Sequence, residues 1–313
     1  MFKYALRRIL LTFPLLLAVL TIVFALVRIA PGDPAMSMLG NYASQEVLEV
    51  LRKEMGLDAP MWLQYLRYLR DLSRGNLGIS MLNAQPVTHQ LLVALPYTLE
   101  LTFGAMVVGI ILGIPMGVYT ALRRNMTEDY TGRIVSLAGI SIPSFFLGIL
   151  LLFFFSVKLN LFPVLGGGRE GDIVDRLHHL CLPALSLGLI MTSYIMRLTR
   201  STMLNVLNED FVRTARSKGL QETIVIYKHS LLNALVPIVS VLGIYFIINL
   251  GSSIMTEIVF SRPGLGKVIV MAMKQRDYVM LQSVMVVYST LAILINLLVD
   301  LIYGFLDPRI KYK

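Results

Sequence analysis

Two glycine-rich segments of the chain raise the question of phosphate binding. Gly264-Leu265-Gly266-Lys267 resembles the end of a nucleotide-binding loop, in which backbone N–H groups and a lysine hold phosphates. However, Ser261 stands where that loop has its first glycine, and Val268 follows the lysine where Ser or Thr would bind magnesium. The run Gly166-Gly167-Gly168 has no Lys-Ser or Lys-Thr after it, which favours a flexible turn. The sequence therefore predicts no nucleotide site in this chain.

The residue types also argue against metal binding and covalent catalysis. His178, His179 and Cys181 lie close together, but no second cluster of ligands completes a metal site. An intramembrane aspartyl protease would need two aspartates within membrane spans, and only Asp300 is near one. A serine protease would need a histidine within a span, and the apolar runs contain none. We therefore predict no catalytic residue and no metal ligand.

The segment Thr199–Leu232 has a composition suited to binding another protein. It is polar and basic, and Phe211, Val212 and Ala215 can share one face of a helix. Gly219 ends this helical pattern, and a second short helical run, Glu222–Leu232, follows. We call residues 199–232 the elbow. A docking site is favoured, and a solvated loop is the alternative.

The composition of the chain is unusually apolar, and this indicates which kind of helices carry these residues. The 313-residue chain is 56% hydrophobic and only 15% charged, with a mean hydropathy of +0.71. Soluble domains carry about 25% charged residues. The formal net charge of +9 suits nucleic acid or an anionic membrane surface, and the hydropathy favours the membrane. The single cysteine excludes an internal disulfide.

Uncharged runs long enough to cross a bilayer indicate six transmembrane helices. About 20 apolar residues span the hydrocarbon core. The first run is too long for a signal peptide and has no cleavage site after it, so we expect it to be retained. Pro115 lies deep enough in the second run to predict a kink. The runs are Ile9–Val27, Leu101–Leu122, Ile134–Val157, Leu180–Met196, Ser230–Thr256 and Leu281–Val299.

Lysine and arginine are concentrated in alternate short loops, which predicts that both termini are cytoplasmic. The segment 31–94 is then outside. It contains helical patterns at Ser44–Met55 and Trp62–Leu72, and it either packs on the core or contacts a partner. We expect residues 1–30 to form the N-terminal tail and first helix, 31–94 a periplasmic insert, and 95–313 a five-helix core that includes the elbow at 199–232.

Several motifs give the chain a specific family resemblance. Residues Arg213 to Gly219 resemble the EAA loop of ABC importer permeases, although Arg213 and Thr214 replace Glu and the first Ala, and Leu232 stands where Pro is usual. This variant is similar to the peptide and nickel permease family, in particular to its subunit with the long first outer loop. Further matching segments are Ala30–Pro34, Gly56–Pro60, Gly78–Ser80, Thr98–Leu101, Asn233–Pro237, Glu257–Gly266, Arg276–Tyr278 and Asp307–Arg309.

The resemblance implies an all-α, polytopic chain with the six transmembrane helices of the ABC type I importer permease fold. It implies location in the bacterial cytoplasmic (inner) membrane. It also implies a second homologous permease, two ATPase subunits and an external substrate-binding protein as partners, with no nucleic acid. ATP and magnesium would be bound by the ATPases, and no cofactor by this chain. The substrate class would be peptides, with glutathione, nickel or a nickel chelate, and some sugars as alternatives. A passive channel is the alternative outside the family.

Two sets of residues are candidates for this function. The elbow would be the coupling segment, and its expected ATPase contacts are Asp210, Arg213, Thr214, Ala215, Arg216 and Gly219. Small polar residues in spans form helix contacts more often than a path. The cluster Asn249–Ser253 is nevertheless the best path candidate, and Glu257 is expected to shape an outer gate. The candidate path and gate residues are Asn249, Ser252, Ser253, Glu257, Pro263, Gly264 and Gly266.

Overall fold

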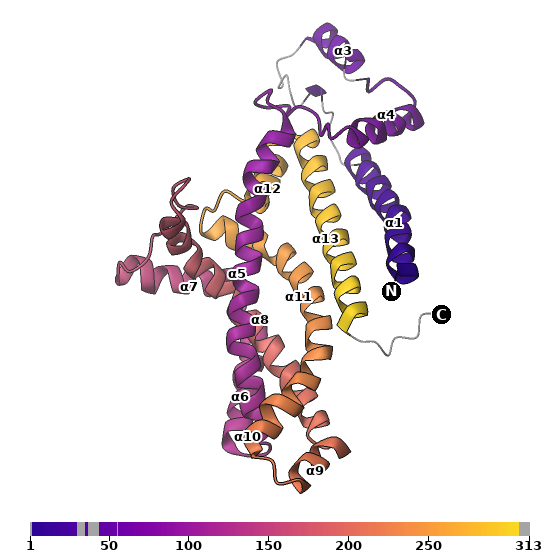
Figure 1. Ribbon diagram of the computed structural model, residues 1–313. Helices are drawn as coiled ribbons and strands as arrows, with labels where there is room; N and C mark the ends of the chain where they lie inside the picture. The colour runs from indigo at the N-terminus through magenta and orange to yellow at the C-terminus, as the bar shows by residue number, and fades with distance from the viewer. Residues whose placement is uncertain (1, 30–34, 37–43, 55, 307–313) are drawn as a thin grey trace. The chain divides into compact units, whose positions relative to one another are not determined.

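The computed structural model describes residues 2–29, 35–36, 44–54 and 56–306 (Figure 1). The motifs Ala30–Pro34 and Asp307–Arg309 lie outside the described residues. Within them the chain is helical, and no strand longer than an isolated bridge between Ile79 and Pro86 is present in this part of the chain. The all-α prediction is therefore confirmed.

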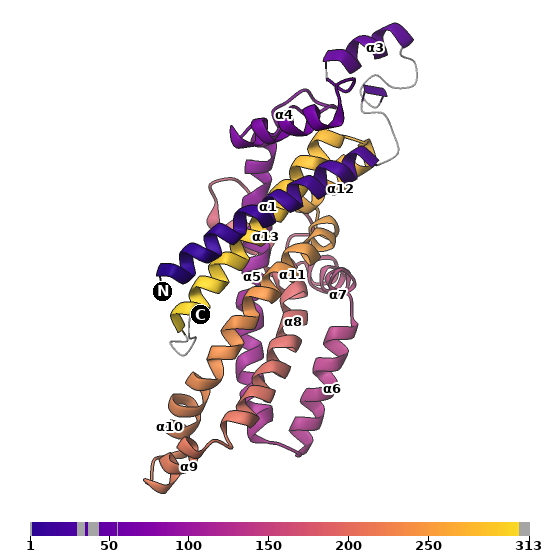
Figure 2. The same ribbon diagram turned by 90° about the vertical axis from the view of Figure 1, so that its right-hand side faces the viewer.

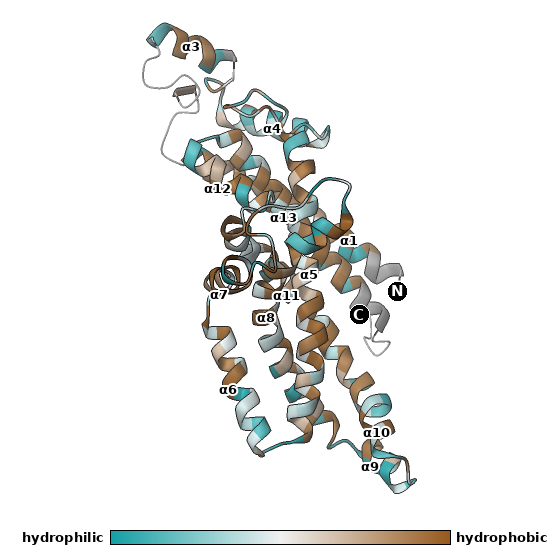
Figure 3. Ribbon diagram, turned by 90° about the vertical axis from the view of Figure 1, so that its left-hand side faces the viewer, coloured by the Kyte–Doolittle hydropathy of each residue, from teal (hydrophilic) through white to brown (hydrophobic). Residues whose placement is uncertain are grey.

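Among the described residues, five continuous helical stretches are long and apolar enough to cross a membrane, as the hydropathy of the sequence predicted. Four are α1 (Phe2–Ile29), α5 (Val87–Leu122), α8 (Ile173–Val206) and α13 (Tyr278–Leu306). The fifth runs without a break through α10 (Glu222–Ile224), the π-helical η2 (Val225–Leu231) and α11 (Leu232–Val259). α5 continues as one helix through Pro115. Figure 3 shows the apolar residues along α5, α11 and α13 and the polar residues on α9 and α4.

The third predicted span, Ile134–Val157, is not one straight helix. α6 (Thr127–Ser141) ends before Ile142, and α7 (Ser144–Leu151) continues into the π-helical η1 (Leu152–Lys158) after a bend of 98°. The residue before a proline is disfavoured in the helical region, and Ile142 is extended with φ −89° and ψ 124°. Pro143 therefore redirects the chain. Counted as one broken span, the bent pair brings the spans in the described part of the chain to six.

The shorter helices are α3 (Gln45–Glu54), α4 (Met61–Ser73), α9 (Asp210–Ser217) and α12 (Leu265–Gln275). The chain divides into two compact units. The first comprises residues 1–5, 98–262 and 295–313, and the second comprises residues 6–97 and 263–294. The predicted boundaries at residues 30 and 94 stay a prediction.

In the first unit, α8 is the central helix, and α6, α7 and α11 pack against it (Figure 2). α5 approaches α8 closely through three glycines four residues apart, Gly109, Gly113 and Gly117. A Cβ atom on Gly117 would lie 2.5 Å from the Cβ of Thr199 and 2.7 Å from the carbonyl oxygen of Met196. Small residues let membrane helices pack backbone to backbone, so these glycines set the α5–α8 distance.

We expect Gly117→Ala to destabilise the purified protein by about 1–3 kcal/mol, because the added methyl group overpacks this contact. The matched control is Gly251→Ala on α11, where a Cβ would meet no atom within 4 Å. Alanine has the higher helix propensity, so the control should gain up to about 1 kcal/mol. Thermal unfolding in detergent measures both. Equal unfolding midpoints for the two variants would show that the close approach of α5 and α8 does not contribute to stability.

In the second unit, the segment between α1 and α5 is bound to the start of α13. The Ser80 hydroxyl donates to the Asp277 carboxylate at 2.5 Å, and both residues are buried. Ser283 donates to the Leu77 carbonyl oxygen at 2.8 Å. The rings of Tyr65 and Tyr68 on α4 pack against Phe24 of α1 with centroids 5.3 and 5.5 Å away. Two sequence motifs that are almost 200 residues apart, Gly78–Ser80 and Arg276–Tyr278, therefore form one contact.

Candidate translocation and coupling sites

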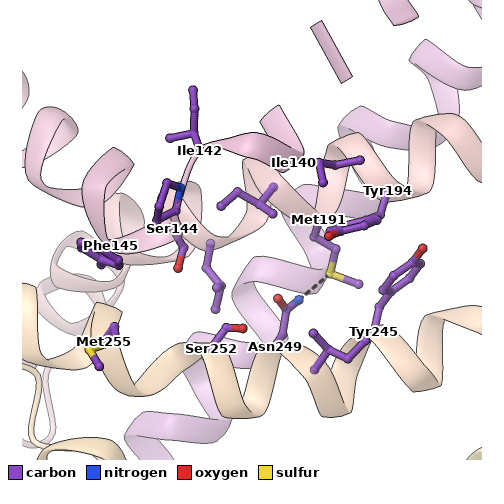
Figure 4. A pocket seen from close by; sticks show the side chains of 14 residues that line it. Ile140, Ile142, Ser144, Phe145, Met191, Tyr194, Tyr245, Asn249, Ser252 and Met255 are labelled. Carbon is purple, nitrogen blue, oxygen red and sulfur yellow. Dashed lines mark hydrogen bonds between the residues drawn. The ribbon is translucent and has the colours of Figure 1, made fainter. Parts of the chain in front are cut away.

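A hollow of about 320 Å³ lies in the first unit where the α6–α7 bend faces α8 and α11 (Figure 4). α11 contributes Tyr245, Asn249 and Ser252, which repeat at helical spacing and so line one face. Pro143 and the bend bring Ser144 to the opposite wall. The remaining lining residues are Ile140, Ile142, Phe145, Leu187, Ile190, Met191, Tyr194, Ile248 and Met255.

The walls of this hollow carry polar groups but no ionisable acid or base other than the two tyrosines. The Asn249 amide donates to the Met191 sulfur at 2.8 Å, and the Tyr194 and Tyr245 rings lie 5.0 Å apart. Amide, hydroxyl and aromatic groups can hydrogen-bond to or stack on a passing solute without selecting its charge. The hollow can therefore accommodate a polar, uncharged segment such as a peptide backbone.

The elbow has its own small core. α9 carries Val212 and Ala215, which are buried against Val225 of η2. Gly219 has φ +75°, a left-handed conformation that suits glycine and turns the chain between α9 and α10. Across this turn the Arg216 guanidinium donates two hydrogen bonds to the Glu222 carboxylate, at 2.7 and 3.2 Å. These bonds raise the pKa of Arg216, so the guanidinium stays charged and links the two arms of the elbow.

Comparison with known proteins assigns the family. A model of the binding-protein-dependent transport system inner membrane component matches residues 113–312, and a model of the N-terminal part of such components matches residues 1–102. The chain belongs to this family. The predicted resemblance to ABC importer permeases is thereby confirmed, and the permease is a multi-pass inner membrane protein.

Curated relatives match the permease from end to end. It is 38% identical to the dipeptide transport system permease protein DppB of Alkalihalophilus pseudofirmus and 40% identical to DppB of Escherichia coli K12, with all of each chain covered. It is also 40% identical to the glutathione transport system permease protein GsiC of Salmonella paratyphi A, again over the whole of both chains. Relatives named for two substrates are thus about equally similar.

The fold has a counterpart among solved structures. The permease matches a chain of the inward-facing MetNI methionine ABC transporter with a TM-score of 0.57 and 21% identity. The match covers 70% of the permease and 96% of that chain. The likeness shows the fold alone, and it confirms the predicted type I importer architecture.

The structure brings together only part of the predicted path set. Asn249 and Ser252 line the hollow. Ser253 is fully buried and donates to the Leu250 carbonyl oxygen, and Glu257 is fully buried and accepts a hydrogen bond from Thr98 at 2.6 Å. Both positions face helix contacts, so neither lines this hollow.

The other predicted gate residues lie in the second unit. Pro263 is exposed, and Gly264 precedes α12 with an extended backbone. Gly266 is buried in the first turn of α12. Their role in a gate stays a prediction, as does that of Glu257.

The predicted coupling residues differ in accessibility. The side chains of Asp210 and Arg213 are 96% and 73% exposed, and Thr214 is exposed beside them. Ala215 instead packs inside the elbow, where it supports α9 rather than offering a surface. Phe211, expected on the same face as Val212 and Ala215, is 41% exposed, because only the latter two positions turn toward η2.

Sequence reasoning missed a group of charges that we call the Glu100 cluster, comprising Glu100, Arg176, Glu257 and Arg262. The Arg262 guanidinium, fully buried, donates to Glu100 Oε2 at 2.7 Å, and Arg176 donates to Glu100 Oε1. The backbone N–H of Arg262 donates to the Glu257 carbonyl oxygen at 2.8 Å. The sequence singled out Glu257 as a gate candidate, but no local spacing indicates that Glu100 pairs with Arg176 and Arg262.

His178 and His179 make local contacts. A ring nitrogen of His178 lies 2.9 Å from the Leu161 carbonyl oxygen, and His179 Nδ1 lies 2.8 Å from the Asp175 carbonyl oxygen. Over residues 2–29, 35–36, 44–54 and 56–306, no three His, Cys, Asp or Glu side chains gather in a way that could hold a metal ion.

Proposed function

We propose that this permease, paired with a second homologous permease, forms the path by which an ABC importer takes up di- or oligopeptides delivered by an external binding protein. The observation that carries the proposal is the 38–40% identity to dipeptide permeases over the full length of both chains. The hollow beside Asn249 and Ser252 supports it, because amide and hydroxyl groups suit a peptide backbone.

The elbow would couple this path to two ATPases that bind ATP and magnesium. Its arms join α8 and α11, two of the helices that line the hollow, so a displacement of α9 can change the hollow. The exposed Asp210, Arg213, Thr214 and Arg216 and the turn at Gly219 supply the contact surface. Both termini would be cytoplasmic, with residues 31–94 on the periplasmic side. The distribution of lysine and arginine supports this orientation.

Glutathione is the second candidate substrate, and the relatives named for glutathione transport favour it. The alignment with GsiC spans 313 residues, the length of this chain, whereas the alignment with Escherichia coli DppB spans 338 and so requires gaps in this chain. Free nickel ions are disfavoured because no histidine or carboxylate lines the hollow.

Uptake by the reconstituted assembly, with both permeases, the ATPases and the binding protein in vesicles, tests the proposal. We expect accumulation of labelled dipeptide that requires ATP and falls to background when Thr214–Gly219 is deleted. A shorter control deletion of the exposed loop residues Arg169–Gly171 should retain uptake. Accumulation of glutathione but not dipeptide would assign the second substrate, and ATP-independent downhill flux through this chain alone would indicate a passive channel instead.

A further inference from the structure

A second pocket, of about 290 Å³, lies between α6 and the C-terminal part of α8. α6 lines it with Arg133, Ser136 and Leu137, and α8 lines it with Arg197, Arg200 and Ser201. Both triplets have the spacing i, i+3, i+4, so each helix presents one continuous face to the pocket. Three guanidinium groups therefore meet in a space that the transport function proposed above does not use.

The single carboxylate nearby is already fully engaged. Asp129, which is fully buried, accepts two hydrogen bonds from Arg200, at 2.5 and 2.8 Å, and one from the Asn125 backbone N–H at 3.0 Å. Arg133 lies 3.6 Å away from it, beyond hydrogen-bond distance. Its Nε and Nη2 are buried without a hydrogen-bond partner, although the side chain as a whole is 41% exposed.

The charges in this pocket therefore do not balance. Three arginines line the pocket, and Asp129 pairs with Arg200 and lies 3.6 Å from Arg133, whereas Arg197 is exposed. Uncompensated charge at a membrane span is costly, and an arginine fork binds a phosphate group through parallel hydrogen bonds. The pocket thus has the donors, the excess positive charge and the room to bind an anionic phosphate group.

We propose that this pocket binds the phosphate group of an anionic membrane lipid. Apolar side chains beside it on α6 are exposed, Ile134 at 67% and Leu137 at 55%, and acyl chains can cover them. In the orientation proposed above, the pocket lies at the cytoplasmic leaflet, where anionic lipids attract basic residues. A bound headgroup would satisfy Arg133 and join α6 to α8 next to the Asp129–Arg200 pair.

Lipid retention by the purified full assembly tests this site. Phosphatidylglycerol or phosphatidylcholine is titrated into the delipidated assembly in detergent, and bound lipids are counted by native mass spectrometry. Wild type should prefer phosphatidylglycerol. The double variant Arg133→Gln/Arg197→Gln should bind it about twenty-five-fold more weakly, from roughly fivefold for each arginine. Arg124→Gln, an exposed residue outside the pocket with the same change in charge, should match wild type.

The single variant Arg197→Gln keeps the Asp129 contacts and should lose about fivefold, which separates ligand loss from misfolding. Equal phosphatidylglycerol binding by wild type and the double variant would overturn the proposal. So would displacement of the lipid by millimolar inorganic phosphate, which would identify a free anion as the ligand. A crosslink from a cysteine at Ser201 to the companion permease would likewise overturn it, because a protein would then cover the pocket. None of these measurements depends on which substrate is transported.

Discussion

Replacing Phe211 by aspartate is expected to separate the permease from its ATPase and abolish uptake. Phe211 is 41% exposed on α9, next to Val212, which is anchored in the core of the elbow. An aromatic side chain held on a rigid support is the usual centre of an interface, and its loss costs about 2 kcal/mol or more. We therefore expect the affinity for the ATPase to fall at least about thirtyfold.

The exposed charges of α9 should contribute less than this ring. Asp210 and Arg213 lie 3.5 Å apart and are almost fully solvated, and such surface pairs are worth about 0–1 kcal/mol. Binding of the purified ATPase to the reconstituted permease, measured together with uptake, compares Phe211→Asp with Arg213→Gln and with Phe211→Leu. The leucine variant keeps an apolar side chain and should retain most of the binding. If Phe211→Asp binds and transports like wild type while Arg213→Gln does not, the contact is electrostatic and our ranking is wrong.

The transmembrane helices and the elbow could be predicted from the sequence because local pattern determines them. Uncharged runs of about 20 residues must form helices in lipid, since no other arrangement of a single segment satisfies the backbone. The turn at Gly219 was predictable for a similar reason, because a glycine after a helical pattern is suited to a left-handed cap.

The position of the 98° bend could not be predicted from the local sequence pattern. Pro14, Pro183 and Pro237 all remain inside helices, whereas the chain turns sharply at Pro143. All of them occur in apolar runs, so composition alone does not distinguish them. The choice depends on tertiary packing, for instance of Gly148 on α7 against the Phe260 ring, where a Cβ would lie 3.0 Å from Cε2.

The hollow was predictable only in part for the same reason. The polar cluster Asn249–Ser253 was visible in the sequence, yet a helix turns successive residues by about 100°. Asn249 and Ser252 therefore face the hollow, while Ser253 is buried and bonds back to Leu250 on the same helix. Tyr194 and Met191 were not placed there in advance. Their position depends on how α8 lies against α11, which no spacing within α8 encodes.

Pairs of charges distant in sequence were the least predictable feature, and the Glu100 cluster is expected to be the most sensitive to change. We expect Arg262→Met to destabilise the permease by about 1.5–3 kcal/mol, because Glu100 loses a charged hydrogen bond and keeps only the one from Arg176. Arg262 is fully buried, whereas the Glu100 side chain is 34% exposed, so water offsets part of the lost bond. Thermal unfolding in detergent and ATP-driven uptake should both reveal the loss.

The matched control is Arg169→Met, the same replacement at an exposed loop position, which should shift stability by less than about 0.5 kcal/mol. The double variant Arg262→Met/Glu100→Gln tests the cause, because it removes both charges and should recover part of the lost stability. The three elements that meet in the cluster are α5, α8 and the end of α11. α8 and α11 also line the hollow. Because the cluster holds their ends together, a displacement of the elbow can tilt both helices about this fixed end. If Arg262→Met unfolds at the same temperature as the wild type, the cluster does not hold these helix ends together.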